Sequence, residues 1–335
     1  MKRYCILPLC IIALLALVCG CSAKQARPQP QDDGTEIRLL SASPATPLPG
    51  ADVRYAVYCL DEGEQLEEYG NYDSDMGDEN AVLVRDGAVL TLQNAGVNKS
   101  GDGRRELMSG LNAAAACIFG SELRMLNSTV TTNALGAPGL FCSGEHTRLG
   151  AEDSKIVTAG ANSPALVCSD GAEIWLNATN LNCEADDAPL IVTYGDVTVT
   201  LCSCALRFTA PRAIVITGGT LSLTLDGQQL IGDIELTGTE ENPAGLTLML
   251  RNGASFTGAI LTDDPEGIRI TMDEMSLWTL TGETWIAALT APDKNFLGIQ
   301  SNGFNIYYNS SLDENAWLAF QSYLLPGGGY LAPLI

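Results

Sequence analysis

The chain of 335 residues carries 40 acidic against 18 basic side chains, a net charge of −22, and a single histidine. This balance leaves no basic surface for a nucleic acid, and one histidine excludes most serine-protease-like, Cys-His and histidine-ligated metal mechanisms. Apolar residues make up 46% and aromatic residues only 6%, with 34 glycines, which together favour repetitive β structure.

Residues 1–20 have the features of a bacterial export signal. Two basic residues precede an apolar run from Ile6 to Val18, which is too short to span a bilayer as a helix. The run ends Val18-Cys19-Gly20-Cys21, which resembles the bacterial lipobox and implies that Cys21 is lipidated and becomes the new N-terminus. Cys19 fits this motif less well, because a large residue precedes it. An ordinary signal peptide with incidental cysteines is the alternative.

Residues 21–50 are predicted to be the lipid-attachment cysteine followed by a linker, rich in proline, that cannot bury enough surface to fold. Removing residues 1–20 deletes two basic residues, so the mature chain has a net charge of 16 − 40 = −24. Two or more acyl chains hold a protein stably on a membrane. We therefore expect an extracytoplasmic protein, lipid-anchored to the bacterial membrane and facing the cell surface.

A repeat of about 25 residues follows the linker. Short apolar runs begin at Asn80, Asn112, Ala137, Ser163, Ala188 and Arg212, at steps of 32, 25, 26, 25 and 24 residues. Three columns stay apolar in every unit: Leu90, Leu123, Leu149, Ile174, Val199, Leu223; Leu92, Met125, Ala151, Leu176, Leu201, Leu225; and Val97, Val130, Ile156, Leu181, Leu206, Leu230. The first two columns are two residues apart, so they lie on one face of a strand.

No unit contains a helix-length amphipathic segment, so a leucine-rich or βα solenoid is excluded. Three short strands and three corners per unit predict an all-β, right-handed, single-stranded parallel β-helix with a short C-terminal cap. The columns fill its interior, and no coil is stable alone. We place the β-helix at residues 51–311 and the cap at residues 312–335. Val53 to Tyr58 is predicted to be an entry strand that covers the first coil, and Ser311 to cap a short helical turn with Glu314.

Small or polar residues recur at two corners of each unit, where strained turn conformations are expected. One corner column is Asn94, Asn127, Asp153, Ala178, Ser203, Gly227, and the other is Gly87, Gly120, His146, Gly171, Asp196, Thr220. The only histidine, His146, is therefore predicted to be a solvated turn residue.

Residues 80–310 resemble the adhesin-like, right-handed parallel β-helix proteins of bacterial surfaces, within the pectin-lyase-like fold. The resemblance rests on the NA-x-LV-x-DGA-x-LTL-x-N start, units of the SPALVCSDGAEIWLNAT type, and the late SLWTLTGETW and GFNIYY segments. It carries no catalytic motif, and it implies a role in surface interaction.

Polysaccharide lyases and hydrolases share this fold, so an enzyme remains the main alternative. Glycoside hydrolysis requires two carboxylates on one face. The doublets Asp186-Asp187 and Asp263-Asp264 are candidates, but neighbouring residues of a strand face opposite ways, which favours solvated corners. A chain this acidic also repels a polyanionic substrate.

The acidic segment containing Asp73, Asp75 and Asp78 does not match the ligand spacing of an EF-hand loop. We expect an acidic loop feeding the first coil, with a weak calcium site as the alternative, and no other cofactor.

Seven cysteines follow Cys21, and three of them, Cys117, Cys142 and Cys168, recur at one place in successive units, followed by Thr193 and Thr217. Parallel side chains in register strain a disulfide. Small buried thiols in an interior column are therefore expected.

The first unit carries an insertion from Asn98 to Leu111, with Arg104 and Arg105 in an otherwise acidic protein. Such extra length is where solenoids grow binding loops, and also where they simply vary. These two arginines are the second candidate site.

Residues between the inward columns must point to solvent, and Trp175 is among them. An exposed indole beside Gly150 and Thr200 suits stacking on a sugar, and Arg124, Arg148 and Glu173 can bond hydroxyls. Glu122, Arg148 and Glu173 are expected to form a ladder of alternating charge. We predict a monomeric, noncatalytic surface lipoprotein that contacts glycans or surface proteins; a purely structural stalk is a further alternative.

Overall fold

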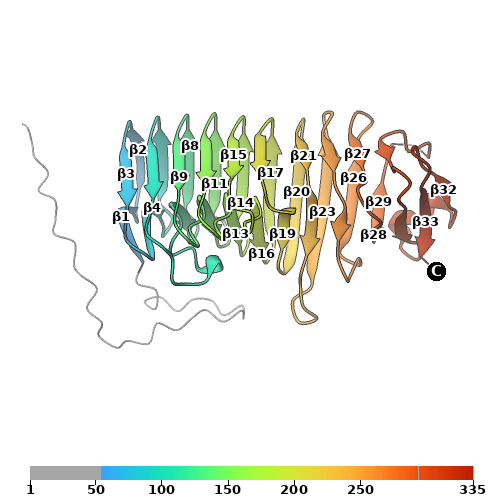
Figure 1. The fold of residues 1–335 in the computed structure, drawn as a ribbon, viewed down its shortest axis with the longest axis horizontal. Coiled ribbons are helices and arrows are strands. Elements are labelled where there is room, and N and C mark those ends of the chain that lie inside the picture. The colour runs from blue at the N-terminus through green and yellow to red at the C-terminus, as the bar shows by residue number, and fades with distance from the viewer. Residues whose placement is uncertain (1–53, 293, 335) are drawn as a thin grey trace, which may run out of the picture. The chain divides into compact units, whose positions relative to one another are not determined.

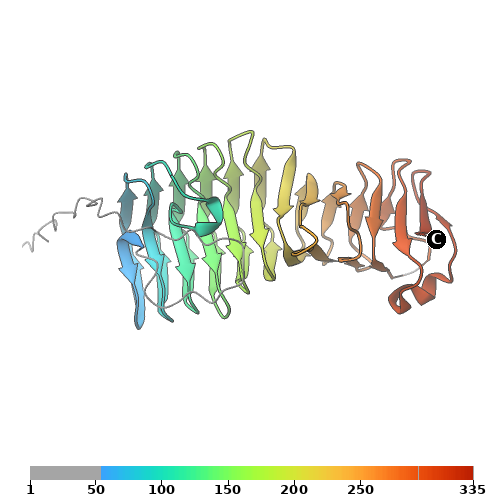
Figure 2. The same cartoon turned by 90° about the horizontal axis from the view of Figure 1, so that it is seen from below.

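The computed structural model describes residues 54–292 and 294–334. The export signal, Cys21 and the linker lie outside the described residues. The described residues belong to the second of two compact units, Val53–Ile335. This unit is an all-β solenoid of about 11 turns with about 25 residues per turn, which confirms the predicted fold class. Figures 1 and 2 show its strands stacked side by side in chain order.

Three faces of parallel strands form the solenoid, and each coil adds one strand to each face. Sheet A contains β1 (Tyr55–Leu60), β4 (Glu79–Val84), β7 (Ala115–Ile118), β10 (Leu140–Ser143), β13 (Leu166–Ser169), β16 (Ile191–Tyr194), β19 (Arg212–Ile216), β22 (Asp233–Leu236) and β25 (Ile260–Leu261). Sheet B contains β2 (Glu64–Glu68), β5 (Val89–Gln93), β8 (Glu122–Leu126), β11 (Arg148–Glu152), β14 (Glu173–Asn177), β17 (Val197–Cys202), β20 (Gly219–Asp226), β23 (Ala244–Arg251), β26 (Ile268–Met272) and β29 (Ala288–Thr290).

The third face is divided into two sheets. Sheet C contains β3 (Asn71–Ser74), β6 (Gly96–Lys99), β9 (Thr129–Thr132), β12 (Lys155–Thr158), β15 (Asn180–Cys183) and β18 (Ala205–Phe208). Sheet D contains β21 (Gln229–Ile231), β24 (Ser255–Thr257), β27 (Leu277–Thr279) and β30 (Ile299–Gln300). Sheet E lies at the C-terminal end and contains β28 (Thr284–Ile286), β31 (Ile306–Asn309), β32 (Tyr323–Leu324) and β33 (Tyr330–Leu334).

The apolar columns run through the interior of the solenoid in the predicted register. Leu176, for example, pairs with Ala151 on one side and with Leu201 on the other, and all three side chains are fully buried. The columns of sheet B stay in register from β5 to β20. Because each layer of one coil packs on the next, the core is a continuous stack of small layers.

A left-handed backbone turn joins sheet B to the third face in successive coils. The residues of the first predicted corner column all have positive φ angles: Asn94, Asn127, Asp153, Ala178, Ser203 and Gly227. His146 has a φ of 61° and is exposed, which confirms the turn prediction. The second predicted corner column differs at its last two members. The left-handed residues there are Gly195 and Gly219, each one position before the predicted Asp196 and Thr220.

The first coil differs from the sequence prediction. Val53 lies outside the described residues. The strand that follows it, β1, covers β4 as expected, but β1, β2 and β3 together form a complete additional coil. Gln65 and Glu67 occupy the inward positions that Leu90 and Leu92 hold in the next coil. The hydroxyl groups of Tyr58 and Tyr72 donate to Glu67 at 3.4 and 3.3 Å. This coil therefore ends the apolar core with a hydrogen-bonded polar layer.

The C-terminal end is covered by a 3₁₀ helix, η2 (Asp313–Leu318), and by sheet E. Asn315 accepts a hydrogen bond from the backbone of Leu289, and the indole of Trp317 donates to the carbonyl of the same residue. The predicted capping box is wrong: Leu312 is the N-cap, it makes no side-chain cap hydrogen bond, and Ser311 donates to Asn309 instead. Parallel pairing of β31 with β33 continues to Leu334.

Cys117, Cys142 and Cys168 are adjacent in sheet A and buried, with free thiols. Burial raises the pKa of Cys142 and Cys168, so both remain protonated. The column continues with Thr193 and then Ile216, not Thr217 as the repeat suggested. The prediction of small thiols that fill an interior column is confirmed.

Candidate functional site

The outer face of sheet B carries the predicted cluster. Two outward columns run across its strands: Glu122, Arg148, Glu173, Thr198, Ser222; and Arg124, Gly150, Trp175, Thr200, Thr224. They face solvent because successive side chains of a strand alternate between the core and the surface. The structure thus brings together the four residues predicted for the first site, Trp175, Arg124, Arg148 and Glu173.

Trp175 lies against Gly150 of the neighbouring strand. A Cβ added to Gly150 would lie 2.7 Å from Cε3 and 2.9 Å from Cζ3 of the indole. The ring therefore covers the space that a side chain would fill, and 45% of Trp175 remains exposed. The outer surface of the ring therefore faces solvent.

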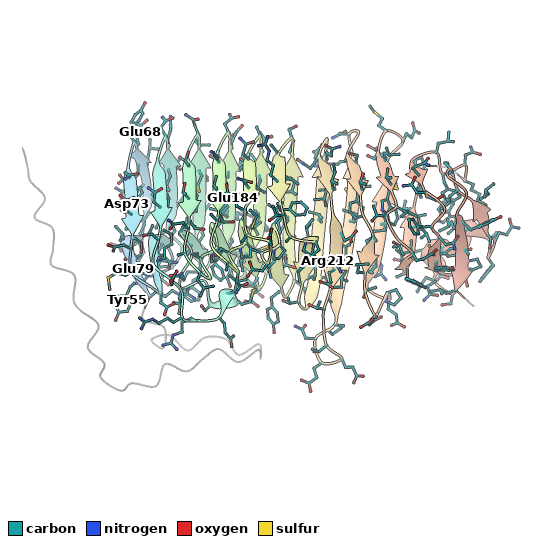
Figure 3. The ribbon with its side chains drawn as sticks, in the orientation of Figure 1. Tyr55, Glu68, Asp73, Glu79, Glu184 and Arg212 are labelled. Carbon is teal, nitrogen blue, oxygen red and sulfur yellow. The ribbon has the colours of Figure 1, made fainter. Side chains whose placement is uncertain are left out.

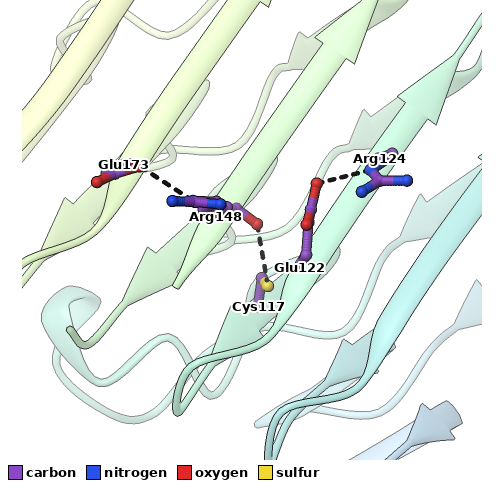
Figure 4. Close-up of polar contacts among 5 residues, drawn as sticks. All are labelled: Cys117, Glu122, Arg124, Arg148 and Glu173. Atoms are coloured by element: carbon purple, nitrogen blue, oxygen red, sulfur yellow. Dashed lines mark hydrogen bonds and ion pairs between the residues drawn. The ribbon is translucent and has the colours of Figure 1, made fainter. Parts of the chain in front are cut away.

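Two ion pairs line the same depression as this indole, and Figure 4 shows both pairs. Arg124 donates through Nε to Glu122 Oε1 at 2.6 Å, and Arg148 donates through Nε to Glu173 Oε2 at 3.1 Å. The predicted continuous ladder is wrong in its first half, because Glu122 pairs with Arg124 of its own strand. The hydrogen bond and charge of Glu122 raise the pKa of Arg124. Each exposed pair contributes at most about 1 kcal/mol to folding.

A shallow trough passes through these residues. One half has a volume of about 260 Å³, and its lining residues are Glu122, Arg124, Arg148, Leu149, Gly150, Glu173, Ile174, Trp175, Thr198 and Thr200. The other half, of about 380 Å³, is lined by Gly171, Glu173, Asp196, Val197, Thr198, Thr220 and Ser222. The halves share Glu173 and Thr198, so the two depressions that form the trough are neighbours on the outer face of sheet B.

The far half of the trough adds residues that the sequence does not mark as part of a site. Gly171, Asp196 and Thr220 belong to a predicted corner column, which suggests turns and no ligand. The repeat still places this column two residues before the outward positions of Glu173 and Thr198. Asp196 accepts a hydrogen bond from the backbone of Thr220 at 2.8 Å, which fixes this edge of the trough.

The second candidate, Arg104 and Arg105, lies elsewhere. The insertion between β6 and β7, with its 3₁₀ helix η1 (Leu107–Ser109), packs against β13 and covers the outer face of sheet A. Leu107 and Met108 lie on a second apolar cluster: Leu83, Ala113, Ala116, Ile118, Phe141, Val167 and Val192. Arg104 is exposed and its backbone donates to Asp78. The insertion thus serves as an apolar cover, and its arginines do not join the trough on sheet B.

A buried lysine, Lys99 at the end of β6, lies against the acidic loop. Lys99 is 2% exposed, and its ammonium donates to the carbonyls of Met76 and Gly101, the latter at 2.8 Å. Burial lowers the pKa of Lys99 to about 8, although Glu79, Asp78, Asp102 and Asp75 oppose the shift. Within the described residues, no group of three or more His, Cys, Asp or Glu side chains is arranged to hold a metal ion.

The carboxylate doublets lie in exposed loops. Asp187 accepts hydrogen bonds from the backbone of Asn162 at 3.1 and 3.2 Å, so it serves as a turn residue. Asp264 accepts through its side chain from the backbone of Glu266 at 3.0 Å. Figure 3 shows the surface side chains of the solenoid, among them Glu68, Asp73, Glu184 and Arg212.

No protein-family model matches the chain, and no curated protein matches its sequence. In the part of the chain that the structure describes, no helix is long and apolar enough to cross a membrane.

Proposed function

We propose that this protein is a noncatalytic, lipid-tethered surface protein of a bacterium and that it contacts glycans through the trough on sheet B. The exposed indole of Trp175, seated on Gly150 and close to two ion pairs, is the observation that carries the proposal. The likeness to adhesin-like β-helix proteins and the lipobox ending at Cys21 support the surface location.

The side chains of the trough match the two surfaces of a sugar. The C–H face of a pyranose packs on an aromatic ring, while its hydroxyl groups need donors and acceptors around that ring. Arg148 and Glu173 supply both kinds of group on one side of Trp175, and the hydroxyls of Thr198 and Thr200 supply more on the next strand. A shallow, solvated site of this kind is suited to reversible contact.

The carboxylates of the trough are arranged for contact and not for hydrolysis. Glu122 and Glu173 each accept a hydrogen bond from an arginine, so each carboxylate is already engaged in an ion pair. The ion-pair geometry therefore supports the noncatalytic proposal.

A glycan array on the mature lipoprotein tests this function, with assays for reducing sugars and unsaturated products on the same substrates. We expect binding without turnover, and at least tenfold weaker binding by Trp175→Ala. Trp285→Ala is the matched control, because Trp285 is 38% exposed but lies in β28, stacked on Tyr307. Turnover of any substrate contradicts the noncatalytic proposal. Binding that Trp175→Ala leaves unchanged excludes the trough.

A further inference from the structure

We propose that Lys99 and Asn112 condense into an amide cross-link between their side chains, which fastens the insertion over the outer face of sheet A. Lys99 is the last residue of β6, and Asn112 lies three residues before β7, so the two residues mark the base of the insertion. The cross-link is a modification within one chain, and it is independent of the proposed glycan contact.

One backbone carbonyl brings the two side chains together. Lys99 Nζ donates to the carbonyl oxygen of Gly101 at 2.8 Å, and Asn112 Nδ2 donates to the same oxygen at 3.0 Å. The two nitrogen atoms are therefore separated by no more than the sum of these distances. Both side chains are buried, with 2% of Lys99 and 5% of Asn112 exposed. An amine and a carboxamide held so close together react as an intramolecular pair.

Two glycines allow the backbone to close around this pair. A Cβ at Gly101 would collide with the backbone of Met76, and a Cβ at Gly103 would lie 2.9 Å from Asn112 Nδ2. The acidic loop and the insertion thus touch through their backbones. Such close packing keeps bulk water away from the two side chains.

Lys99 is suited to act as the nucleophile. Burial lowers its pKa to about 8, so a fraction of the side chain is an uncharged amine near neutral pH. The ammonium has three N–H groups, and two of them donate to the carbonyls of Met76 and Gly101. The amine keeps both hydrogen bonds and has a lone pair in place of the third N–H group.

Asn112 is held as the electrophile. The backbone N–H of Asp78 donates to Asn112 Oδ1 at 2.9 Å, which polarises the amide carbonyl and stabilises the oxyanion that forms when Nζ adds to Cγ. The carbonyls of Leu135 and Gly136 accept from Nδ2 at 3.3 and 3.4 Å and orient the nitrogen that leaves.

The condensation balances without a co-reactant. The bond between Nζ and Cγ forms, the bond between Cγ and Nδ2 breaks, and Nδ2 leaves as ammonia with the proton that Nζ gives up. Glu79 carries this proton, because it is buried and its charge acts on Lys99 more strongly than that of the other three carboxylates, Asp78, Asp102 and Asp75. The product replaces a buried cation with a neutral amide, which removes the cost of burying the charge.

Mass spectrometry of the natural chain tests the cross-link. Because the reaction requires the amine, we expect chain held at about pH 6 to keep its full mass and chain held at about pH 9.5 to lose the mass of one ammonia molecule. Return to the lower pH should not reverse this loss, and peptide mapping should join Lys99 to Asn112. Full mass at both pH values, or a loss of ammonia that maps to another asparagine, overturns the proposal.

Cleavage within the insertion gives a second readout on the same preparations. Arg104 is exposed and lies between the two linked residues, so trypsin can cut after it without separating the fragments of a condensed chain. Under denaturing conditions we expect the cut chain from the higher pH to migrate as one species and that from the lower pH to separate into two. Two fragments from both preparations contradict the cross-link.

Two variants test the roles of the side chains, with circular dichroism to show that each is folded. Lys99→Arg keeps a cation that does not lose its proton, so we expect no condensation. Glu79→Gln should slow condensation at least tenfold, whereas Asp75→Asn, in the same loop, is the matched control and should leave the rate unchanged. Loss of ammonia from Asn112 in Lys99→Arg refutes Lys99 as the nucleophile, and an unchanged rate in Glu79→Gln refutes Glu79 as the proton carrier.

Discussion

Gly150 lies beneath the indole of Trp175, and the two residues occupy paired positions of β11 and β14. Glycine within a strand is unfavourable, because it loses more conformational entropy than other residues and packs no side chain. At this position the missing side chain creates the seat for the indole. Gly150 thus lowers the stability of the strand, and it allows the exposed ring of Trp175 to lie against the backbone.

Replacing Gly150 by valine should weaken glycan binding without lowering the melting temperature. The new side chain would collide with Cε3 and Cζ3 of Trp175 and displace the ring, so we expect at least tenfold weaker glycan binding. The melting temperature should not fall, because valine favours strands. Titration and thermal denaturation of the same preparation measure both quantities. Unchanged affinity would show that the seat of Trp175 is irrelevant to binding.

Leu176 tests the interior stack. Leu176→Asp buries an unpaired charge between Ala151 and Leu201, at a cost on the order of several kcal/mol. Leu176→Ala should cost about 2–5 kcal/mol through the cavity alone. Because coils depend on their neighbours, hydrogen exchange should increase in the flanking coils as well. The exposed neighbour Trp175→Ala is the control, and equal melting temperatures for Leu176→Asp and this control would contradict the register.

Ala178 holds a left-handed turn with a φ of 46°, which is unfavourable for a residue with a Cβ. Ala178→Gly should therefore raise the free energy of unfolding by about 0.5–1 kcal/mol. Gly227 occupies the same corner two coils later, and Gly227→Ala should lower stability by a similar amount. Chemical denaturation measures both, and the same sign for the two variants would refute the turn argument.

Lys99 predicts a pH dependence of stability. Its pKa of about 8 in the folded chain lies below the ordinary value of 10.5, so between these values the unfolded chain holds more protons. The free energy of unfolding of the natural chain should therefore increase relative to that of Lys99→Met as the pH rises from 8 to 10.5. Denaturation at several pH values measures the difference. A difference that shrinks over this interval has the wrong sign for a buried ammonium.

Cys21→Ala tests the proposed tether. A chain without the lipid-accepting thiol should remain as unprocessed precursor or be released in soluble form, since one lipidated residue is the proposed anchor. Fatty-acid labelling and membrane fractionation measure this, with Cys19→Ala as the control that should keep the label. Processed, membrane-bound Cys21→Ala protein would show that another element anchors the chain.

The repeat in the sequence was sufficient to predict most of the fold, because each interior column tolerates only apolar residues. Leu90, Leu123 and Leu149 therefore indicate the register, and the three residues are paired on neighbouring strands in the structure. The first coil could not be predicted from the repeat, for a physical reason. Gln65 and Glu67 occupy its inward positions, so the coil lacks the apolar signature by which the others were recognised.

The candidate site could be predicted only as far as the alternation of side chains along a strand determines which of them face solvent. Trp175 had to face outward once Ile174 and Leu176 faced inward. The partner of an exposed charge follows no such rule, because long side chains choose among neighbours of similar energy. The repeat hence predicts a pair between Glu122 and Arg148, whereas Glu122 pairs with Arg124. The insertion packs on sheet A because Leu107 and Met108 lie on an apolar outer face of that sheet. The repeat does not indicate this apolar face, so the position of the insertion could not be predicted.

The polar layer at Gln65 and Glu67 determines how such a molecule can change in length during evolution. A duplicated coil placed between β5 and β8 would find apolar layers on both sides. A coil added ahead of Tyr55 would instead bury the carboxylate of Glu67 in a dry interior. A duplicated coil brings no new partner for this carboxylate, so the free energy of folding would become less favourable. New length must therefore enter within the array. Each such duplication would carry the Trp175 trough about 4.8 Å further from the first coil.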